Sequence, residues 1–114
     1  MSKLARLIAS EEGFGIPGSQ PTRKLNPGDL RHAPHTSHDG EGSNDIGIEP
    51  SVDDGWLDLE RQLQLFAQRG MSLRDAIYAF APPSENNSEK YLEFIAQGLG
   101  VSPDTSVTEA LKIQ

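Results

Sequence analysis

The chain has 114 residues, contains no cysteine and carries a formal net charge of -7. This length suits a single domain with one modest hydrophobic core, which we expect to span residues 1–114. The lack of cysteine excludes disulfides and thiolate metal sites, and the acidic balance argues against binding to nucleic acids, whose affinity for proteins comes largely from Lys and Arg. No stretch of the sequence is long and apolar enough to predict a membrane span, and the N-terminus lacks the apolar run of a signal peptide.

A short amphipathic helix is predicted over residues 2–12. Ser2 can cap its N-terminus, and a series of glycines that begins at Gly13 prevents the helix from continuing. Its apolar face is formed by residues at helical spacing, namely Leu4, Leu7 and Ile8.

The predicted helix ends on two adjacent carboxylates, Glu11 and Glu12. A carboxylate held at the edge of a core loses part of its hydration, and this loss raises its pKa toward the range that a general acid needs near neutral pH. The alternative is a pair of solvated side chains at a helix end. Helical periodicity does not choose between Glu11 and Glu12 as the acid.

Residues 13–50 show no lasting helical period and hold five of the eight prolines and all three histidines. Because long loops inside small domains are usually functional, we expect an ordered, irregular segment beside a cleft. A brief alternation of polar and apolar residues over Asn44–Glu49 predicts a small strand or hairpin arm. The segment also supplies candidates for a second catalytic carboxylate, namely Asp39, Glu41, Asp45 and Glu49.

Three histidines in this segment, His32, His35 and His38, are spaced by three residues. Imidazoles and carboxylates can bind zinc, but no helical pattern gathers these rings on one face and their spacing fits no zinc motif. We therefore expect loop histidines that hydrogen-bond to the backbone or to nearby acids, and we predict neither a metal site nor another cofactor.

The strongest element is a helix that begins after Ser51 and ends at Gly70, and we expect it to be the central core helix. One of its faces is apolar, with Trp56, Leu59, Leu63 and Phe66 in line and Leu57 and Leu65 widening the stripe.

Three later helices are predicted from their N-cap residues and from the residues that end them. Ser72 opens a short helix that Pro82 and Pro83 end. Ser88 opens a helix over residues 89–97, which Gly98 and Gly100 end. Ser106 is expected to cap a last helical turn.

Carboxamides and an aromatic ring follow the Pro-Pro pair, at Asn86, Asn87 and Tyr91. Amides match the hydrogen-bonding groups of sugar hydroxyls and N-acetyl groups, and aromatic rings can stack on sugar faces. The alternative is a linker in which asparagine caps the following helix. An earlier turn that begins at Asn26 needs no function of its own.

Taken in order, these motifs resemble small lysozyme-like proteins of phages and prophages, which are related to lytic transglycosylases and goose-type lysozymes. The resemblance covers roughly residues 4–104, and the block at residues 82–87 is its most specific part. The motifs that carry it are Glu12-Gly13-Phe14, Asn26-Pro27-Gly28-Asp29-Leu30-Arg31, Asp54-Gly55-Trp56, Arg61-Gln62-Leu63, Arg69-Gly70-Met71-Ser72-Leu73 and Tyr78-Ala79-Phe80-Ala81-Pro82-Pro83-Ser84-Glu85-Asn86-Asn87, followed by Tyr91.

The resemblance implies a mainly α, lysozyme-like fold, with four to five helices around a central helix and a small β-hairpin or irregular region beside a cleft. It implies cleavage of peptidoglycan between N-acetylmuramic acid and N-acetylglucosamine, with Glu12 as the acid by analogy to phage lysozymes; the spacing in lytic transglycosylases would select Glu11. The sugar subsites would then be lined by Asn26, Asn86, Asn87 and Tyr91. Such a protein would be made in the bacterial cytoplasm and act at the cell wall, or be carried in a phage particle.

The chain departs from this family in two places. Asp29 stands where the relatives' motif has asparagine, and residues 32–50 replace the Gly-Thr-Gly hairpin of phage lysozymes. The second carboxylate, and with it the choice between hydrolysis and transglycosylation, therefore stays open. An alternative function is a non-catalytic virion structural protein or peptidoglycan-binding module with the same fold.

Overall fold

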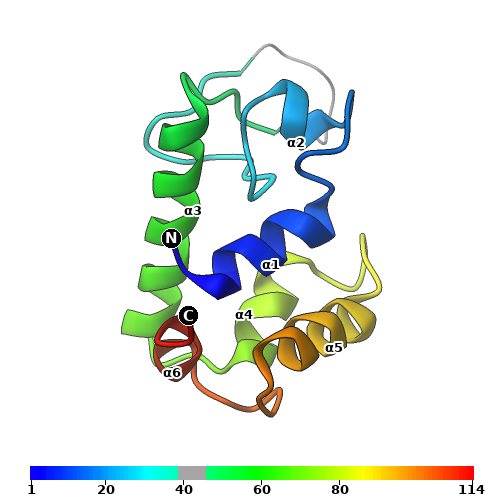
Figure 1. Ribbon diagram of the computed structural model, residues 1–114, viewed down its shortest axis with the longest axis vertical. Coiled ribbons are helices and arrows are strands. Elements are labelled where there is room, and N and C mark those ends of the chain that lie inside the picture. Colours follow the sequence, from blue (N-terminus) through cyan, green and yellow to red (C-terminus); the bar gives the residue numbers. More distant parts are fainter. Residues whose placement is uncertain (39–45) are drawn as a thin grey trace.

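The computed structural model describes residues 1–38 and 46–114. The described residues are mainly helical, which confirms the predicted class (Figure 1). Six helices follow one another along these residues: α1 (Lys3–Glu12), α2 (Gln20–Arg23), α3 (Val52–Gln68), α4 (Leu73–Phe80), α5 (Ser88–Leu99) and α6 (Val107–Leu111).

The β structure in the described residues is limited to two isolated antiparallel bridges. One pairs Ser37 with Ile48, and the other pairs Ser72 with Ser106. The first bridge includes part of the predicted hairpin arm at Asn44–Glu49, while residues 44 and 45 lie outside the described residues.

Serine caps open four of the helices as the sequence predicts. In each case the hydroxyl accepts a hydrogen bond from a backbone N–H three residues later, and such a cap contributes about 1 kcal/mol of stability. The four caps are Ser2, Ser51, Ser72 and Ser106.

The prediction for α5 was wrong in its N-cap and placed its last residue two positions too early, whereas Gly100 ends the helix as predicted. Asn87 is its N-cap and accepts from the backbone N–H of Lys90, whereas Ser88 is the first helical residue and donates its hydroxyl proton to the carbonyl of Ala81. The helix passes through Gly98 and ends at Gly100, whose φ of 74° is the left-handed conformation typical of a glycine cap.

The core forms where α1, α3, α4, α5 and α6 meet (Figure 1). Leu57 was predicted to widen the apolar face of α3, but 60% of it is exposed. Trp56 is only partly buried and packs edge-on against Phe14, with 5.5 Å between the ring centroids. The largest side chains that are almost completely buried are Leu4, Ile8, Leu59, Leu63, Leu73, Ile77, Leu92 and Ile95.

The segment predicted to be irregular contains a helix that the sequence analysis missed. Ser19 caps α2, and Pro21 occupies its first turn, where the missing N–H leaves no hydrogen bond unmade. A helix of four residues is too short to show a hydrophobic period.

The turn after α2 lies against the first turns of α3 at Gly55. A Cβ at Gly55 would come within 2.2 Å of the Leu25 carbonyl oxygen and 2.7 Å of Pro27, so only glycine permits this approach. The close approach anchors the turn of residues 26–31 to the central helix.

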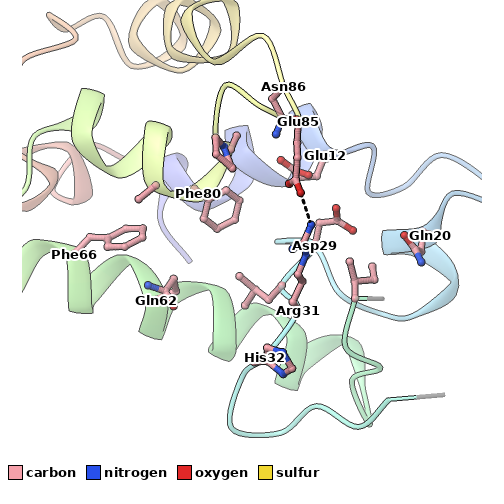
Figure 2. A pocket seen from close by; sticks show the side chains of 15 residues that line it. Glu12, Gln20, Asp29, Arg31, His32, Gln62, Phe66, Phe80, Glu85 and Asn86 are labelled. Carbon is pink, nitrogen blue, oxygen red and sulfur yellow. Dashed lines mark hydrogen bonds and ion pairs between the residues drawn. The ribbon is translucent and has the colours of Figure 1, made fainter. Parts of the chain in front are cut away.

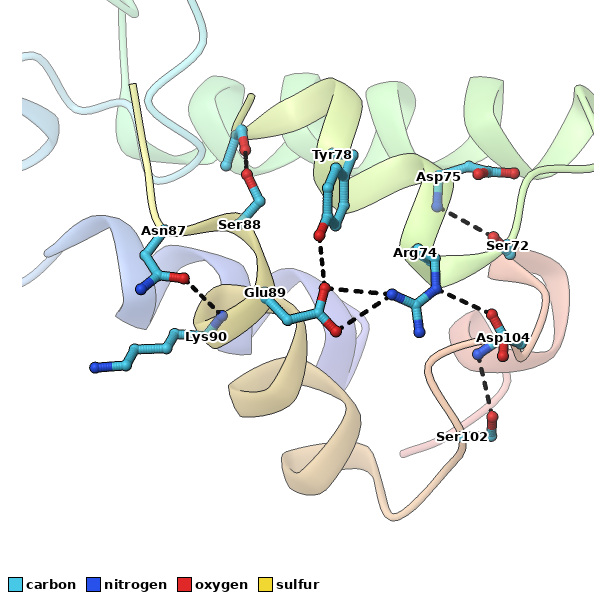
Figure 3. A network of polar contacts seen from close by, with 11 residues as sticks. Ser72, Arg74, Asp75, Tyr78, Asn87, Ser88, Glu89, Lys90, Ser102 and Asp104 are labelled. Atoms are coloured by element: carbon cyan, nitrogen blue, oxygen red, sulfur yellow. Dashed lines mark hydrogen bonds and ion pairs between the residues drawn. The ribbon is translucent and has the colours of Figure 1, made fainter. Parts of the chain in front are cut away.

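A surface network joins α4, α5 and the loop before α6 (Figure 3). Arg74 forms ion pairs of 3.2 Å with both Glu89 and Asp104, and the hydroxyl of Tyr78 donates to Glu89 over 2.6 Å. Exposed ion pairs contribute little to stability individually, so the network chiefly fixes how α4 and α5 meet. Within residues 1–38 and 46–114, no helix has both the length and the apolar character of a membrane span.

Candidate functional site

A cavity of about 640 Å³ opens where α1 ends and where α4 turns into α5 (Figure 2). This volume falls within the range of about 300–1,000 Å³ that is typical of small-molecule sites. The turn after α2 and one face of α3 complete its walls. The lining residues that carry polar or aromatic groups are Glu12, Gln20, Asp29, Arg31, His32, Gln62, Phe66, Phe80, Glu85 and Asn86.

Glu12 is the last residue of α1 and reaches the cavity because the chain turns away at Gly13, whose φ is 88°. The hydroxyl of Tyr91 donates a hydrogen bond of 2.6 Å to its Oε2 atom. Burial is the main cause that raises the pKa of Glu12 from 4.5 to about 7, and the Tyr91 hydrogen bond opposes this rise. The carboxyl of Glu12 therefore loses its proton at a higher pH than an ordinary glutamate does.

Asp29 lies beside Glu12, and the sequence analysis did not propose it as a site residue. Its φ of 52° places it in the left-handed region that aspartate tolerates at the end of a Pro-Gly turn. Its side chain is within hydrogen-bonding reach of Glu12, and its negative charge further raises the pKa of Glu12. Burial also raises the pKa of Asp29, and its Oδ1 atom is buried with no hydrogen-bond partner among the described residues.

Two carboxyls this close favour a state in which one proton is held between them, because two negative charges at short range repel strongly. Glu12 keeps its proton at a pH where an ordinary glutamate has lost it. The pair can therefore supply an acid near neutral pH.

An ion pair crosses the mouth of the cavity between Arg31 and Glu85 (Figure 2). Its N–O distance is 2.9 Å, and nearly half of each side chain is exposed. The pair joins the turn after α2 to the α4–α5 loop, two segments that face each other over Glu12.

Carboxamides and aromatic rings make up much of the remaining wall. Gln20, Gln62 and Asn86 each offer a donor and an acceptor, and Phe80 adds an apolar surface. Asn86 could be predicted from the sequence, whereas the two glutamines could not, because a glutamine on the polar face of a helix has the same sequence signal as any solvated side chain.

Asn26 was predicted to contact sugar, but the structure places it in the interior, with 0% of its surface exposed. Its side chain donates to the carbonyls of Leu30 and Gly47 and accepts from the N–H of Leu30. The two contacts with Leu30 hold the turn together, and the contact with Gly47 ties the turn to the segment before α3. Asn26 does not line the cavity.

The other two predicted sugar contacts also lie elsewhere. Asn87 is exposed, caps α5 and is not part of the cavity wall. Tyr91 is 4% exposed, and its hydroxyl is directed at Glu12. Tyr91 thus acts on the acid instead of offering its ring to a ligand.

The three loop histidines do not gather at one point. The rings of His32 and His38 lie 4.8 Å apart, and His38 also bonds to the carbonyl of Arg31. His35 instead bonds through Nδ1 to Asp58 over 2.7 Å. These contacts confirm for His35 and His38 the expectation of loop histidines that bond to an acid or to the backbone, whereas His32 contacts the ring of His38.

Of the loop carboxylates proposed as the second catalytic group, Asp39, Glu41 and Asp45 lie outside the described residues. Glu49 is 2% exposed and is not among the residues that line the cavity. Burial and the neighbouring Asp58 raise the pKa of Glu49 to about 8. This interior position excludes it from direct contact with a ligand in the cavity.

Comparison with protein-family models, with curated proteins and with solved structures finds no match to this chain.

Proposed function

We propose that this protein is a lysozyme-like enzyme that cleaves the glycan strands of peptidoglycan, with Glu12 as the general acid. The observation that carries the proposal is a carboxyl with a pKa of about 7 in the wall of a cavity of about 640 Å³. A general acid works best when its pKa lies near the working pH, and cleavage of a glycosidic bond requires such an acid beside the leaving oxygen.

In the proposed reaction, Glu12 transfers its proton to the glycosidic oxygen as the bond between that oxygen and the anomeric carbon breaks. Positive charge then develops on the sugar ring, and the carboxylate that remains stabilises it. Tyr91 fixes the position of the Glu12 carboxyl through its 2.6 Å hydrogen bond. Asp29 keeps Glu12 protonated before the reaction through its charge and its proximity.

The closeness of Glu12 and Asp29 bears on which product forms. Retaining glycosidases place their two carboxyls about 5–5.5 Å apart and inverting ones about 6.5–9.5 Å apart, so that a nucleophile or a water fits on the far side of the sugar. Asp29 interacts directly with the acid itself, and a carboxyl bonded to the acid does not lie on the far side of the sugar. Asp29 is therefore not suited to the role of nucleophile or water-activating base.

A route with one acid fits this arrangement better. The 6-hydroxyl of the muramic acid attacks its own anomeric carbon and returns its proton to the Glu12 carboxylate, which gives a 1,6-anhydro sugar and consumes no water. We propose this intramolecular capture over hydrolysis. The amides of Gln20, Gln62 and Asn86 would hold the N-acetyl and hydroxyl groups of the glycan, and Phe80 would support a sugar face.

We also propose that the protein is made in a bacterial cytoplasm and acts at the cell wall, or is carried there in a phage particle with virion proteins as partners. The formal charge of -7 offers no long-range attraction to an anionic wall. Recognition would depend on short-range contacts in the cavity.

Clearance of purified sacculi tests this function, and the adjacent glutamate supplies a matched control. Glu12→Gln should abolish the loss of turbidity, while Glu11→Gln, a change at an exposed position of the same helix end, should keep it. Co-sedimentation of each variant with sacculi separates binding from turnover. Wild-type protein that co-sediments but releases no product would instead support a non-catalytic binding module.

A further inference from the structure

A second cluster of ionisable side chains lies outside the cavity, between α3 and the loops that precede it. It consists of His35, Glu49 and Asp58, whose potential ligand atoms all lie within 4.8 Å of one another. None of the three lines the cavity that contains Glu12. The cluster is therefore a separate feature of the molecule.

Each member is held by a different part of the chain. Asp58 lies on the buried face of α3, and the ring of His35 bonds to it over 2.7 Å while the His35 backbone N–H donates to it over 3.2 Å. Glu49 is fixed by its own N–H, which donates to the carbonyl of Lys24 over 3.0 Å. The Glu49 side chain lies close to α3 at Gly55, where a Cβ would be 3.4 Å from Glu49 Cγ.

The Glu49 carboxylate is buried, and its capacity to accept hydrogen bonds is unused among the described residues. Glu49 is 2% exposed, and neither of its carboxylate oxygens has a hydrogen-bond partner among the described residues. A buried polar group without a partner is costly, and native proteins rarely leave one. One of these oxygens lies within 4.8 Å of ligand atoms of His35 and Asp58, and Asp58 is also 2% exposed.

We propose that His35, Glu49 and Asp58 form a binding site for a divalent transition-metal cation of the zinc type. One imidazole and two carboxylates match the mixed nitrogen and oxygen ligands that zinc accepts, whereas calcium and magnesium prefer oxygen alone. Three protein ligands leave a fourth position for water. The side chain of His35 is 46% exposed, so a cation can reach the two buried carboxylates from its side.

The bound cation would link the loop of residues 31–38 and the segment of residues 46–50 to α3. These two segments also contribute Arg31, His32 and Ile46 to the wall of the cavity. The site would therefore brace one wall of the cavity without contacting its contents. The proposal does not depend on the function of Glu12, because its readouts are binding and stability.

Calorimetric titration of the full chain with zinc chloride, after removal of metal with a chelator, tests the proposal. The expected result is one saturable site per chain and a rise in Tm that grows with zinc concentration. Cobalt chloride in place of zinc should give visible absorption bands typical of a bound ion.

Four variants locate the site. Glu49→Gln keeps the side-chain shape and should abolish binding, and His35→Ala should weaken it at least tenfold. His32→Ala tests the other loop histidines, and Asp104→Asn tests an exposed surface acid; both should bind zinc as the wild type does. Circular dichroism of Glu49→Gln confirms that a loss of binding does not come from unfolding.

Two results would overturn the proposal. One is the absence of saturable zinc binding by the wild-type chain, in which case a proton shared between Glu49 and Asp58 accounts for the buried carboxyls. The other is binding that persists in both Glu49→Gln and His35→Ala, or that is lost in His32→Ala, because the metal would then lie elsewhere.

Discussion

The hydroxyl of Tyr91 on α5 donates a hydrogen bond of 2.6 Å to the carboxyl of Glu12 at the end of α1. The two residues are 79 positions apart in the sequence, and the packing of α1 against α5 brings them together. The contact stabilises the charged form of Glu12, whereas burial and the nearby Asp29 stabilise the neutral form. The pKa of about 7 is the balance of these opposing effects.

Tyr91→Phe should shift the pH dependence of activity toward higher pH. The change removes the one contact from Tyr91 that lowers the pKa of Glu12, so the acid stays protonated further into the alkaline range. A hydrogen bond to a charged group is worth on the order of one pH unit or more in such a shift. The measurement is the rate of sacculus clearance as a function of pH, and the shift is read from the pH at which this rate falls on the alkaline side. If that pH is the same in Tyr91→Phe and the wild type, the Tyr91 contact does not set the pKa of Glu12.

Asp29→Asn should lower the pH at which activity falls on the alkaline side, which is the opposite of the shift expected for Tyr91→Phe. Without the charge of Asp29, the pKa of Glu12 falls toward its ordinary value, and the acid is lost at a lower pH. Activity at pH 8 should therefore fall more than activity at pH 5. Equal loss of activity at all pH values would instead assign Asp29 a role in the chemical step.

Glu12→Gln should increase stability at alkaline pH while it removes activity. The pKa of Glu12 is about 7 in the folded chain against an ordinary 4.5, so the folded state binds its proton more tightly than the unfolded state does. The stability of the wild type consequently falls as the pH rises through this window, and a neutral glutamine does not share that loss. The variant should be more stable by on the order of 1–3 kcal/mol above pH 7 and similar to the wild type below pH 4.5. Urea unfolding at several pH values tests this, and a variant that is less stable at pH 8 would contradict the assigned burial.

Asn26→Ala should destabilise the protein far more than Asn87→Ala. The first change removes three buried hydrogen bonds and leaves the N–H of Leu30 and the carbonyl of Gly47 without a partner, at a cost of about 2–5 kcal/mol. The carbonyl of Leu30 keeps its hydrogen bond from the N–H of Gly47. The second removes an exposed helix cap worth about 1 kcal/mol. Thermal unfolding of both variants gives the comparison. Similar stability for the two would argue that the Asn26 contacts are not formed in solution.

The helices could be predicted well because their signals are local. Serine caps and the spacing of Leu59, Leu63 and Phe66 depend on residues within one or two turns, and the structure agrees with them. The predicted helix boundaries were wrong where tertiary contacts determine them. Ser88 could cap a helix equally well from sequence alone, but in the folded chain its hydroxyl bonds to Ala81 and Asn87 takes the cap.

The site was predictable only in part, for a related reason. Glu11 and Glu12 could both be proposed because a glutamate at the end of an amphipathic helix is a local pattern, and the resemblance to phage lysozymes then favoured Glu12. Asp29 could not, since its effect depends on a turn that folds back against α1. Asn26 shows the converse case, because an asparagine in a turn has the same sequence signal whether it faces a ligand or the interior.

Mass spectrometry of the fragments released from purified peptidoglycan tests the central claim most directly. We predict 1,6-anhydro-muramic ends from the wild type and from Glu11→Gln, and no fragments from Glu12→Gln. Fragments released by Glu12→Gln at the wild-type rate would contradict the account, because the glycosidic oxygen would then receive its proton from another group.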